Sequence, residues 1–169
     1  MAHIPEDRHK DGLVLDYDLQ QNLVLQSYFT KRFQNHGFLK FDAIRSYAEE
    51  LIKKFDIRSG QGVNSIVRGM SGGNQQKVIF GKWLEREPQL FMMDEPTRGI
   101  DVGAKYEIYE LIINMAKQGK TIIVVSSEMP EILGITNRIG VMSNGHLSGI
   151  VNTKETDQEE LLRLSAKYL

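Results

Sequence analysis

The chain has 169 residues, of which 41% are hydrophobic and 25% charged, so its length and composition fit one soluble domain with a hydrophobic core. Its 21 Lys and Arg residues balance 22 Asp and Glu residues, and a formal net charge of -1 argues against nucleic acid or an anionic membrane surface as a partner. The absence of cysteine excludes disulfides and thiolate metal sites and is compatible with a reducing cytosol.

Apolar runs in the sequence are short. No purely apolar run is longer than residues 122–125, and this run is far shorter than the roughly 18 to 20 residues that a membrane-spanning helix needs. The polar residues 1–8 lack the basic start and apolar stretch of a signal peptide. We therefore expect a cytoplasmic protein.

The first half of the chain is predicted to be mainly helical. Residues 18–26 start with an N-cap aspartate and carry a glutamine three residues later, which is the spacing of a capping box. Residues 42–55 repeat apolar side chains at spacings of three and four, which predicts one amphipathic helix. A third helix is expected over residues 71–86, with Ser71 as its N-cap.

Residues 27–41, between the first two helices, form an irregular and unusually aromatic stretch. We expect its aromatic side chains to pack against other parts of the protein. They are Tyr28, Phe29, Phe33, Phe38 and Phe41.

The second half changes to alternating strands and helices. An apolar run closed by an acid, residues 89–94, predicts a strand, and residues 102–118 predict a helix with Gly119 as its C-cap. A second strand is expected over the β-branched run 121–127, and a short helix near Pro130. This pattern is typical of a parallel sheet buried on both faces. The apolar face expected for the longer helix consists of Tyr109, Ile112, Ile113 and Ala116.

The end of the chain predicts a hairpin followed by a helix. Two strand-like runs, residues 138–142 and 146–151, flank an Asn-Gly pair, which is a strong hairpin signal. Thr156 and Glu159 have the spacing of a capping box in front of a last helix.

The segment SGGNQQK, residues 71–77, carries the first chemical signal. A helix N-terminus offers unpaired N–H groups and a partial positive charge, and glycines let a phosphate approach the backbone closely. Phosphate is the natural ligand there. On the residues alone a second interpretation stays open, in which the serine only caps the helix and the glycines only form a turn. The candidate ligand-binding residues are Ser71, Gly72, Gly73 and Asn74.

The second signal is LFMMDEP, an apolar strand that ends in two consecutive acids. At the carboxyl end of a buried strand, Asp94 could hold Mg²⁺ through water. Glu95 could orient or deprotonate an attacking water molecule. The alternative is that one acid caps the following turn while the other is solvated.

Together the two motifs resemble the ABC ATPase family, with a signature segment, a helix and a Walker B strand that ends in Asp-Glu-Pro. Residues 97–103 resemble the D-loop of this family, so Asp101 is expected near nucleotide, and Ser127 occupies the place of the switch histidine. The resemblance covers essentially the whole chain. SGGNQQK, DEPTRGIDVGAK and VSSEMPE are most similar to the second nucleotide-binding domain of tandem-domain importers for galactosides, ribose and similar sugars.

The resemblance implies an α/β fold, a partial P-loop NTPase (ABC) core with parallel strands and an α-helical subdomain. Residues 1–88 would form the Q-loop and the helical subdomain with the signature motif, and residues 89–169 the carboxy-terminal half of the ATPase core. Glu6 stands where most family members have the Q-loop glutamine, close to the metal, so the chain would be truncated just before the Q-loop. The surface of the helical subdomain receives a helix of the membrane subunit in this family, although at least half of the aromatic residues are expected in the subdomain core.

The sequence also departs from the family pattern. It holds no G-x-x-x-x-G-K-[ST] phosphate loop. The nearest candidate, Gly119-Lys120-Thr121, has Asn114 at the first glycine position and lies between a helix and a strand in the wrong order, so we reject it. A serine in place of the switch histidine, and a glutamate in place of the Q-loop glutamine, weaken the expectation of efficient hydrolysis.

The function implied by the resemblance is a part of the ATP-hydrolysing subunit that powers sugar import. Two such domains dimerise head to tail, so Ser71 and Gly73 of one would contact the γ-phosphate of ATP held by the other. ATP and Mg²⁺ are the implied cofactors, and a second nucleotide-binding domain and a membrane-spanning permease are the implied partners, at the cytoplasmic face of the membrane. We expect little or no activity from the chain alone, and possible self-association through an exposed sheet edge. A non-catalytic interaction module is the alternative, and the solute, whether galactoside, ribose, another sugar or a nucleoside, stays open.

Overall fold

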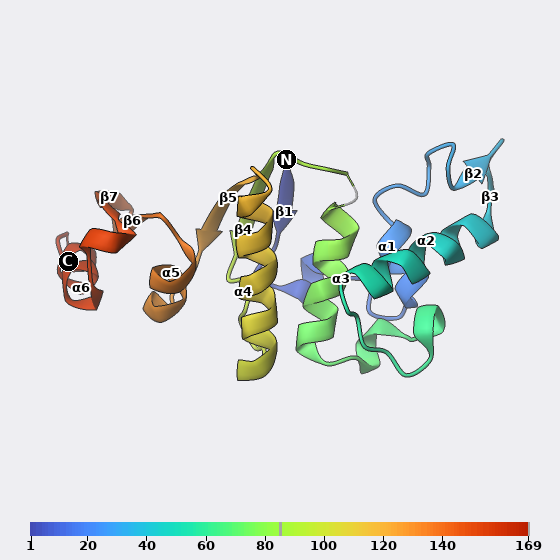
Figure 1. The fold of residues 1–169 in the computed structure, drawn as a ribbon, viewed down its shortest axis with the longest axis horizontal. Coiled ribbons are helices and arrows are strands. Elements are labelled where there is room, and N and C mark those ends of the chain that lie inside the picture. The colour runs from blue at the N-terminus through green and yellow to red at the C-terminus, as the bar shows by residue number, and fades with distance from the viewer. Residues whose placement is uncertain (85, 169) are drawn as a thin grey trace. The chain divides into compact units, whose positions relative to one another are not determined.

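The computed structural model describes residues 1–84 and 86–168 (Figure 1). The chain forms two compact units, Met1–Ile123 and Val124–Leu169. These units reflect packing alone, so the expected division into a signature part, residues 1–88, and a core part, residues 89–169, stays a prediction.

The chain contains a three-stranded sheet with the strand order β1-β4-β5, and the boundary between the two units falls within β5. The strands of this sheet are β1 (Ala2–Ile4), β4 (Leu90–Asp94) and β5 (Thr121–Val125). β1 and β4 run parallel, with Ala2 opposite Phe91 and Ile4 opposite Met93. The α/β fold class is thereby confirmed, as are the two predicted strands. The three residues of β1 were missed, because so short a run carries no periodicity.

β5 is not buried on both faces, which corrects the expectation from its sequence. Ile123 is 48% and Val125 56% exposed. β5 stands at the end of the strand order, with β4 as its single neighbour within the described sheet. An apolar sequence therefore did not mean a central strand here.

Three helices form the helical part of the first unit, and α4 follows β4. The helical part consists of α1 (Leu19–Val24), α2 (Phe41–Lys54) and α3 (Gly72–Leu84), and the helix after β4 is α4 (Val102–Lys117). The predicted capping box of α1 is confirmed, since Gln21 N–H donates to Asp18 Oδ1 over 2.8 Å and Asp18 N–H donates to Gln21 Oε1 over 3.0 Å. α1 packs against both α2 and α3, and α3 packs against α4 and β1. Short helical turns are η1 (Arg8–Gly12), η2 (Gly62–Asn64), η3 (Val67–Gly69) and, in the second unit, η4 (Thr153–Glu155).

The buried face of α4 differs from the predicted one. Ile112 is buried as expected, but Ile108 and Met115 complete the buried face. Ala116 is exposed. The predicted face was displaced around the helix, because the packing of α4 against α3, with Ala104 beside Gly73, selects the buried side.

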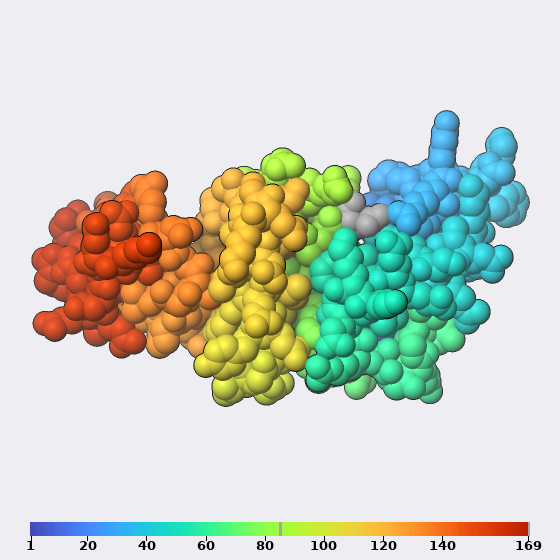
Figure 2. All heavy atoms as spheres, in the orientation of Figure 1, coloured from blue at the N-terminus to red at the C-terminus, as the bar shows by residue number. Residues whose placement is uncertain are grey.

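The aromatic segment before α2 forms a small hairpin of β2 (Gln34–Asn35) and β3 (Phe38–Leu39). Phe33 is buried and its ring centroid lies 4.9 Å from that of Tyr47. The expectation that at least half of these aromatics lie in the core is wrong, since the other four are 49% to 80% exposed: Tyr28, Phe29, Phe38 and Phe41. Phe38 is exposed because it lies in the hairpin, which projects beyond the N-terminal end of α2 (Figures 1 and 2), whereas Tyr28 and Phe29 precede the hairpin and Phe41 begins α2.

The second unit contains α5 (Met129–Ile135), the antiparallel pair β6 (Arg138–Ser143) and β7 (His146–Asn152), and α6 (Gln158–Ser165). The hairpin prediction is confirmed, with Asn144 and Gly145 at φ 44° and 80°, as a two-residue turn of this kind requires. The predicted cap of α6 is wrong by one residue: Asp157 caps it, its Oδ1 accepting from Glu160 N–H over 2.9 Å. This unit has its own small apolar core of Ile139, Val141, Leu161 and Leu164.

Candidate functional site

The two parallel strands β1 and β4 bring the predicted acidic residues to one edge of the sheet. Ile4 lies opposite Met93, so the residues that follow β1 lie beside Asp94, the last residue of β4. Glu6 does not project as a free carboxylate, because it forms an ion pair with the Arg98 guanidinium. This ion pair thus connects the segment after β1 to the loop after β4.

Glu95 lies at a sharp bend of the main chain directly after β4. Its φ of 43° is in the left-handed region, which few residues other than glycine adopt. The carbonyl of Glu95 accepts a hydrogen bond from Arg98 N–H over 3.0 Å, which closes a tight turn. Strained backbone of this kind concentrates at functional sites. Asp94 and Glu95 are both half-buried.

The donor set at this edge suits Mg²⁺ better than a metal that needs a closed cage. Within residues 1–84 and 86–168, no cluster of three or more histidine or acidic side chains could enclose a metal ion. Mg²⁺ keeps several water molecules and binds through one or two carboxylates together with substrate phosphates. Asp94 therefore fits as a single carboxylate that would hold the ion, while Glu6 is committed to Arg98.

Arg8 joins three segments of the site, and sequence reasoning missed it. Its guanidinium donates to the carbonyls of Arg98 over 2.7 Å and Gly99 over 3.1 Å, and its Nε donates to Gln75 Oε1 over 3.2 Å. His9 Nε2 also lies 2.9 Å from Gln75 Oε1. These contacts fix the residues after β1 to α3 and to the loop that follows β4.

The two glycines at the start of α3 are explained by packing inside the chain. A Cβ on Gly72 would lie 3.0 Å from Arg8 Nη2 and 3.0 Å from the Gly99 carbonyl oxygen. A Cβ on Gly73 would lie 2.5 Å from Ala104 Cβ, a contact that real Cβ atoms do not make. The motif therefore needs glycine here to let α3 touch the loop after β4 and the first turn of α4.

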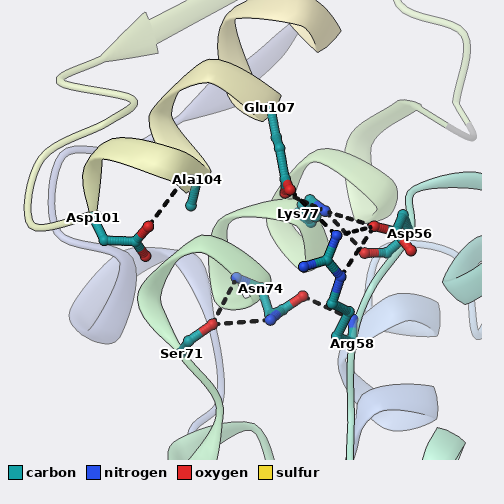
Figure 3. A network of polar contacts seen from close by, with 8 residues as sticks. All are labelled: Asp56, Arg58, Ser71, Asn74, Lys77, Asp101, Ala104 and Glu107. Carbon is teal, nitrogen blue, oxygen red and sulfur yellow. Dashed lines mark hydrogen bonds and ion pairs between the residues drawn. The ribbon is translucent and has the colours of Figure 1, made fainter.

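Ser71 precedes α3 and is exposed, with its hydroxyl held by a neighbour (Figure 3). Asn74 Nδ2 donates to Ser71 Oγ over 2.9 Å, and Asn74 Oδ1 accepts from Arg58 N–H over 2.7 Å. Asp101, the N-cap of α4, accepts from Ala104 N–H over 3.0 Å. Since Ala104 also touches Gly73, the serine and the aspartate belong to helix starts that pack directly together.

Further along α3 from Ser71, the buried ammonium of Lys77 joins α3 to α4. Lys77 is 4% exposed, and its Nζ lies 2.7 Å from Glu107 Oε2 and donates to the Asp56 carbonyl over 2.9 Å. Arg58 contacts both Asp56 and Glu107, and its hydrogen bond and charge hold the pKa of the Asp56 carboxyl below its usual value. A buried charge needs such partners, because desolvation would otherwise destabilise the fold.

Most of the site residues predicted in the first unit thus lie at two places, where α3 packs on α4 and where β1 pairs with β4. Ser127 follows β5 in the second unit, where Glu128 N–H donates to the neighbouring Ser126 Oγ over 3.0 Å. The catalytic role predicted for Ser127 stays a prediction, as do the ligand roles of the other residues.

The fold of the chain is that of an ABC ATPase domain. A solved dimeric ATP-binding cassette in a post-hydrolysis state, bound to ADP and Pi, matches with a TM-score of 0.70 and 21% identity, over 90% of this chain and 62% of that chain. No protein-family model matches the chain. At this identity the structural match supports the fold alone.

Sequence similarity identifies the branch of this class. The galactose/methyl galactoside import ATP-binding proteins MglA of Treponema denticola and Treponema pallidum are 58% and 55% identical over 100% and 99% of the chain, and that of Pasteurella multocida is 47% identical over 99%. The chain therefore matches, along almost its whole length, a segment of these sugar-import ATP-binding proteins. It spans about a third of the length of these curated relatives, 34%, 33% and 33%.

Proposed function

We propose that this chain is the signature-bearing part of an ATP-binding subunit that powers the import of a simple sugar, galactose or a methyl galactoside, as the names of its relatives suggest. One observation carries the proposal. The exposed Ser71 at the start of α3 is packed, through Gly73 and Ala104, against the start of α4 that Asp101 caps. This arrangement leaves the Ser71 hydroxyl exposed while the helices behind it are fixed.

The donors at Ser71 act on a nucleotide held by another domain. In the head-to-tail dimer that the resemblance implies, the phosphate loop facing the signature segment belongs to the opposing domain, so the main contacts to these phosphates come from a second nucleotide-binding domain. Ser71 and Gly73 then donate to the γ-phosphate in trans, because the start of a helix favours negative charge. Asp101 borders the same nucleotide, Asn74 belongs to the site through its hydrogen bond to Ser71 Oγ, and Gly72 keeps the backbone close to the nucleotide.

The acids after β4 serve the cleavage of the phosphate. Mg²⁺, when bound, neutralises phosphate charge, and Asp94 holds it through water. Glu95 orients the attacking water, with Ser127 in the place of the switch residue. A missing preorganised donor typically costs about 2.7–4 kcal/mol of transition-state stabilisation, so this chain alone has little or no ATPase activity.

The partners of the complete protein are a second nucleotide-binding domain and a membrane-spanning permease, at the cytoplasmic face of the cell membrane. None of the helices described in residues 1–84 and 86–168 is long and apolar enough to cross a bilayer. The exposed aromatics around β2 and β3, with the adjoining 410 Å³ pocket between α1 and α2, suit a helix of the permease. The exposed residues of β5 also allow self-association.

The same exposed aromatics favour a second candidate function, a non-catalytic module that only docks on a membrane subunit or a complementary domain. The two candidates differ in the role of Ser71. A docking module would bind its partner with or without the serine hydroxyl, whereas the ATPase part needs the hydroxyl for the phosphate contact.

Two measurements test the proposal. The purified chain, titrated with Mg-ATP to millimolar concentration, should show neither saturable binding nor phosphate release. Adding an ABC domain that carries a phosphate loop should raise phosphate release above that of the domain alone, and Ser71→Ala should abolish the gain. Ser46→Ala, at an exposed serine of α2, is the matched control and should keep it. Steady release by the chain alone that Glu95→Gln abolishes would contradict the proposal.

A further inference from the structure

The amide of Asn74 is used within the chain on both sides. Its Oδ1 accepts from Arg58 N–H over 2.7 Å, and its Nδ2 donates to Ser71 Oγ over 2.9 Å (Figure 3). Asn74 is half-buried, whereas Ser71 is exposed. The side chain that reaches outward is therefore the serine, and the asparagine lies behind it.

The orientation of this amide follows from Arg58. A main-chain N–H can only donate, so the atom of Asn74 that faces it must be the oxygen. Rotating the amide by half a turn would place the NH₂ group against that N–H and leave both donors without an acceptor. The nitrogen of Asn74 consequently faces Ser71.

This orientation fixes the direction of the serine hydroxyl. Ser71 Oγ accepts from Asn74 Nδ2, and the main-chain N–H of Asn74 approaches the same oxygen to 3.5 Å. With two donors on its inner side, the oxygen directs its own hydrogen away from them, because a hydroxyl has a single hydrogen to donate. Ser71 is thereby presented to solvent as a hydrogen-bond donor, which is what an anionic oxygen needs.

Arg58 is itself held by Asp56, a residue of its own loop, and by Glu107 on α4. Its guanidinium contacts Asp56 Oδ2 over 2.9 Å and Glu107 Oε1 over 3.3 Å, and Glu107 also pairs with the buried Lys77. An unbroken series of bonds thus runs from the Ser71 hydroxyl through Asn74 and Arg58 to α4. The direction of the hydroxyl depends on α4 being in place.

We propose that Asn74 is a positioning residue, whose side-chain NH₂ group donates to Ser71 Oγ. The Ser71 hydroxyl is thereby left to donate its own hydrogen to a phosphate oxygen of the nucleotide that the opposing domain holds. This inference rests on the proposed function of Ser71, and it assigns Asn74 a role that acts through the serine. Loss of the Asn74 amide lets the hydroxyl rotate inward, and the donor is then aimed away from the phosphate.

A double-mutant cycle tests this inference on the full chain. The probe is an ABC domain that carries a phosphate loop, loaded with Mg-ATP and substituted Glu→Gln at its own catalytic acid, and the measurement is its Kd for the chain. Ser71→Ala should weaken binding roughly tenfold or more, as loss of a hydrogen bond to a charged group does. Asn74→Ala should weaken it several-fold in the parent chain, and should have no further effect in the Ser71→Ala chain.

The outcomes separate the inference from the proposed function. An Asn74→Ala loss that is equally large without the serine hydroxyl overturns the inference alone, as does a Ser71→Ala loss without any Asn74→Ala loss. No effect of Ser71→Ala overturns the proposed function together with the inference. Asn64→Ala, at an exposed asparagine that bonds Gln20, is the matched control and should leave the Kd unchanged.

A second readout needs neither partner nor nucleotide. In the free chain, the side-chain NH₂ resonances of Asn74 should shift on Ser71→Ala, and those of Asn64 should not. This measurement stands even where Asn74→Ala fails to fold. Unchanged Asn74 resonances would show that the amide does not donate to the serine, and the inference would fall.

Discussion

Lys77 Nζ lies 2.7 Å from Glu107 Oε2, and this ion pair joins α3 to α4, the helix that follows β4. The lysine is 4% exposed, so its charge has given up almost all of its contact with water. Its partners replace that water, and the pair fixes how α3 and α4 lie against each other.

Removing the lysine should therefore destabilise the first unit. We expect Lys77→Met to lower the free energy of unfolding by about 3 kcal/mol, because Glu107 loses its closest cation and the Asp56 carbonyl loses a donor. Urea denaturation measures the change. Arg163→Ala, which removes an exposed ion pair with Glu160, is the matched control and should have little effect. Equal losses in the two variants would contradict the assignment of Lys77.

The contact of Gly73 with Ala104 predicts a steric effect. Gly73→Ala should destabilise the chain by about 1–3 kcal/mol, since the new Cβ would lie 2.5 Å from Ala104 Cβ and would force α3 away from α4. Ala104→Gly in the same chain should restore part of the loss. Gly134→Ala serves as the control, because no atom lies within 4 Å of a Cβ there, and thermal denaturation should show no loss of stability.

Lys82 predicts how stability depends on pH. Burial lowers the pKa of its ammonium to about 8, while an unfolded lysine has a pKa of about 10.4. Between these values the unfolded chain binds more protons, so the free energy of unfolding should rise with pH, by up to about 3 kcal/mol, and this gain is absent below pH of about 8. Lys82→Met should remove the rise. Parallel pH profiles of the two chains, from denaturant titrations at each pH, would refute this assignment.

The corrected cap of α6 gives a local test in the second unit. Asp157→Ala should lower the stability of this unit by about 1 kcal/mol, because Glu160 N–H loses its acceptor. Thr156→Ala should cost less, although the capping-box spacing pointed to Thr156. Hydrogen exchange of the amides in the first turn of α6 distinguishes the two variants, and a larger effect at Thr156 would restore the original assignment.

Sequence reasoning succeeded where a local signal decides the structure. The capping box of Asp18 and Gln21, the Asn144-Gly145 turn and the strand that ends at Asp94 all depend on residues close in sequence. It failed where distant residues decide. Arg8 carries no signal in its own neighbourhood, since its partners Gln75, Arg98 and Gly99 reach it only in the folded chain.

Gly72 and Gly73 also show that residues distant in sequence can explain a motif. Sequence reasoning singled them out for a close approach of phosphate, and the structure adds a second reason for them in Arg8, Gly99 and Ala104. Similarly, the aromatic residues around β2 and β3 were expected mostly in the core because composition favours burial. For Phe38, exposure follows from its place in the hairpin that projects beyond α2, which composition does not encode.

The three hydrogen bonds of the Arg8 side chain make it a mechanical joint. The Arg8 side chain donates hydrogen bonds to the carbonyls of residues 98 and 99 and to the side chain of Gln75 on α3, while the main chain of Arg8 follows β1. A displacement of the residues after β1 must either drag both of those segments with it or break bonds to one of them. A pull applied at this end of the chain would consequently reach the serine-bearing helix and the bend after Glu95 at the same moment.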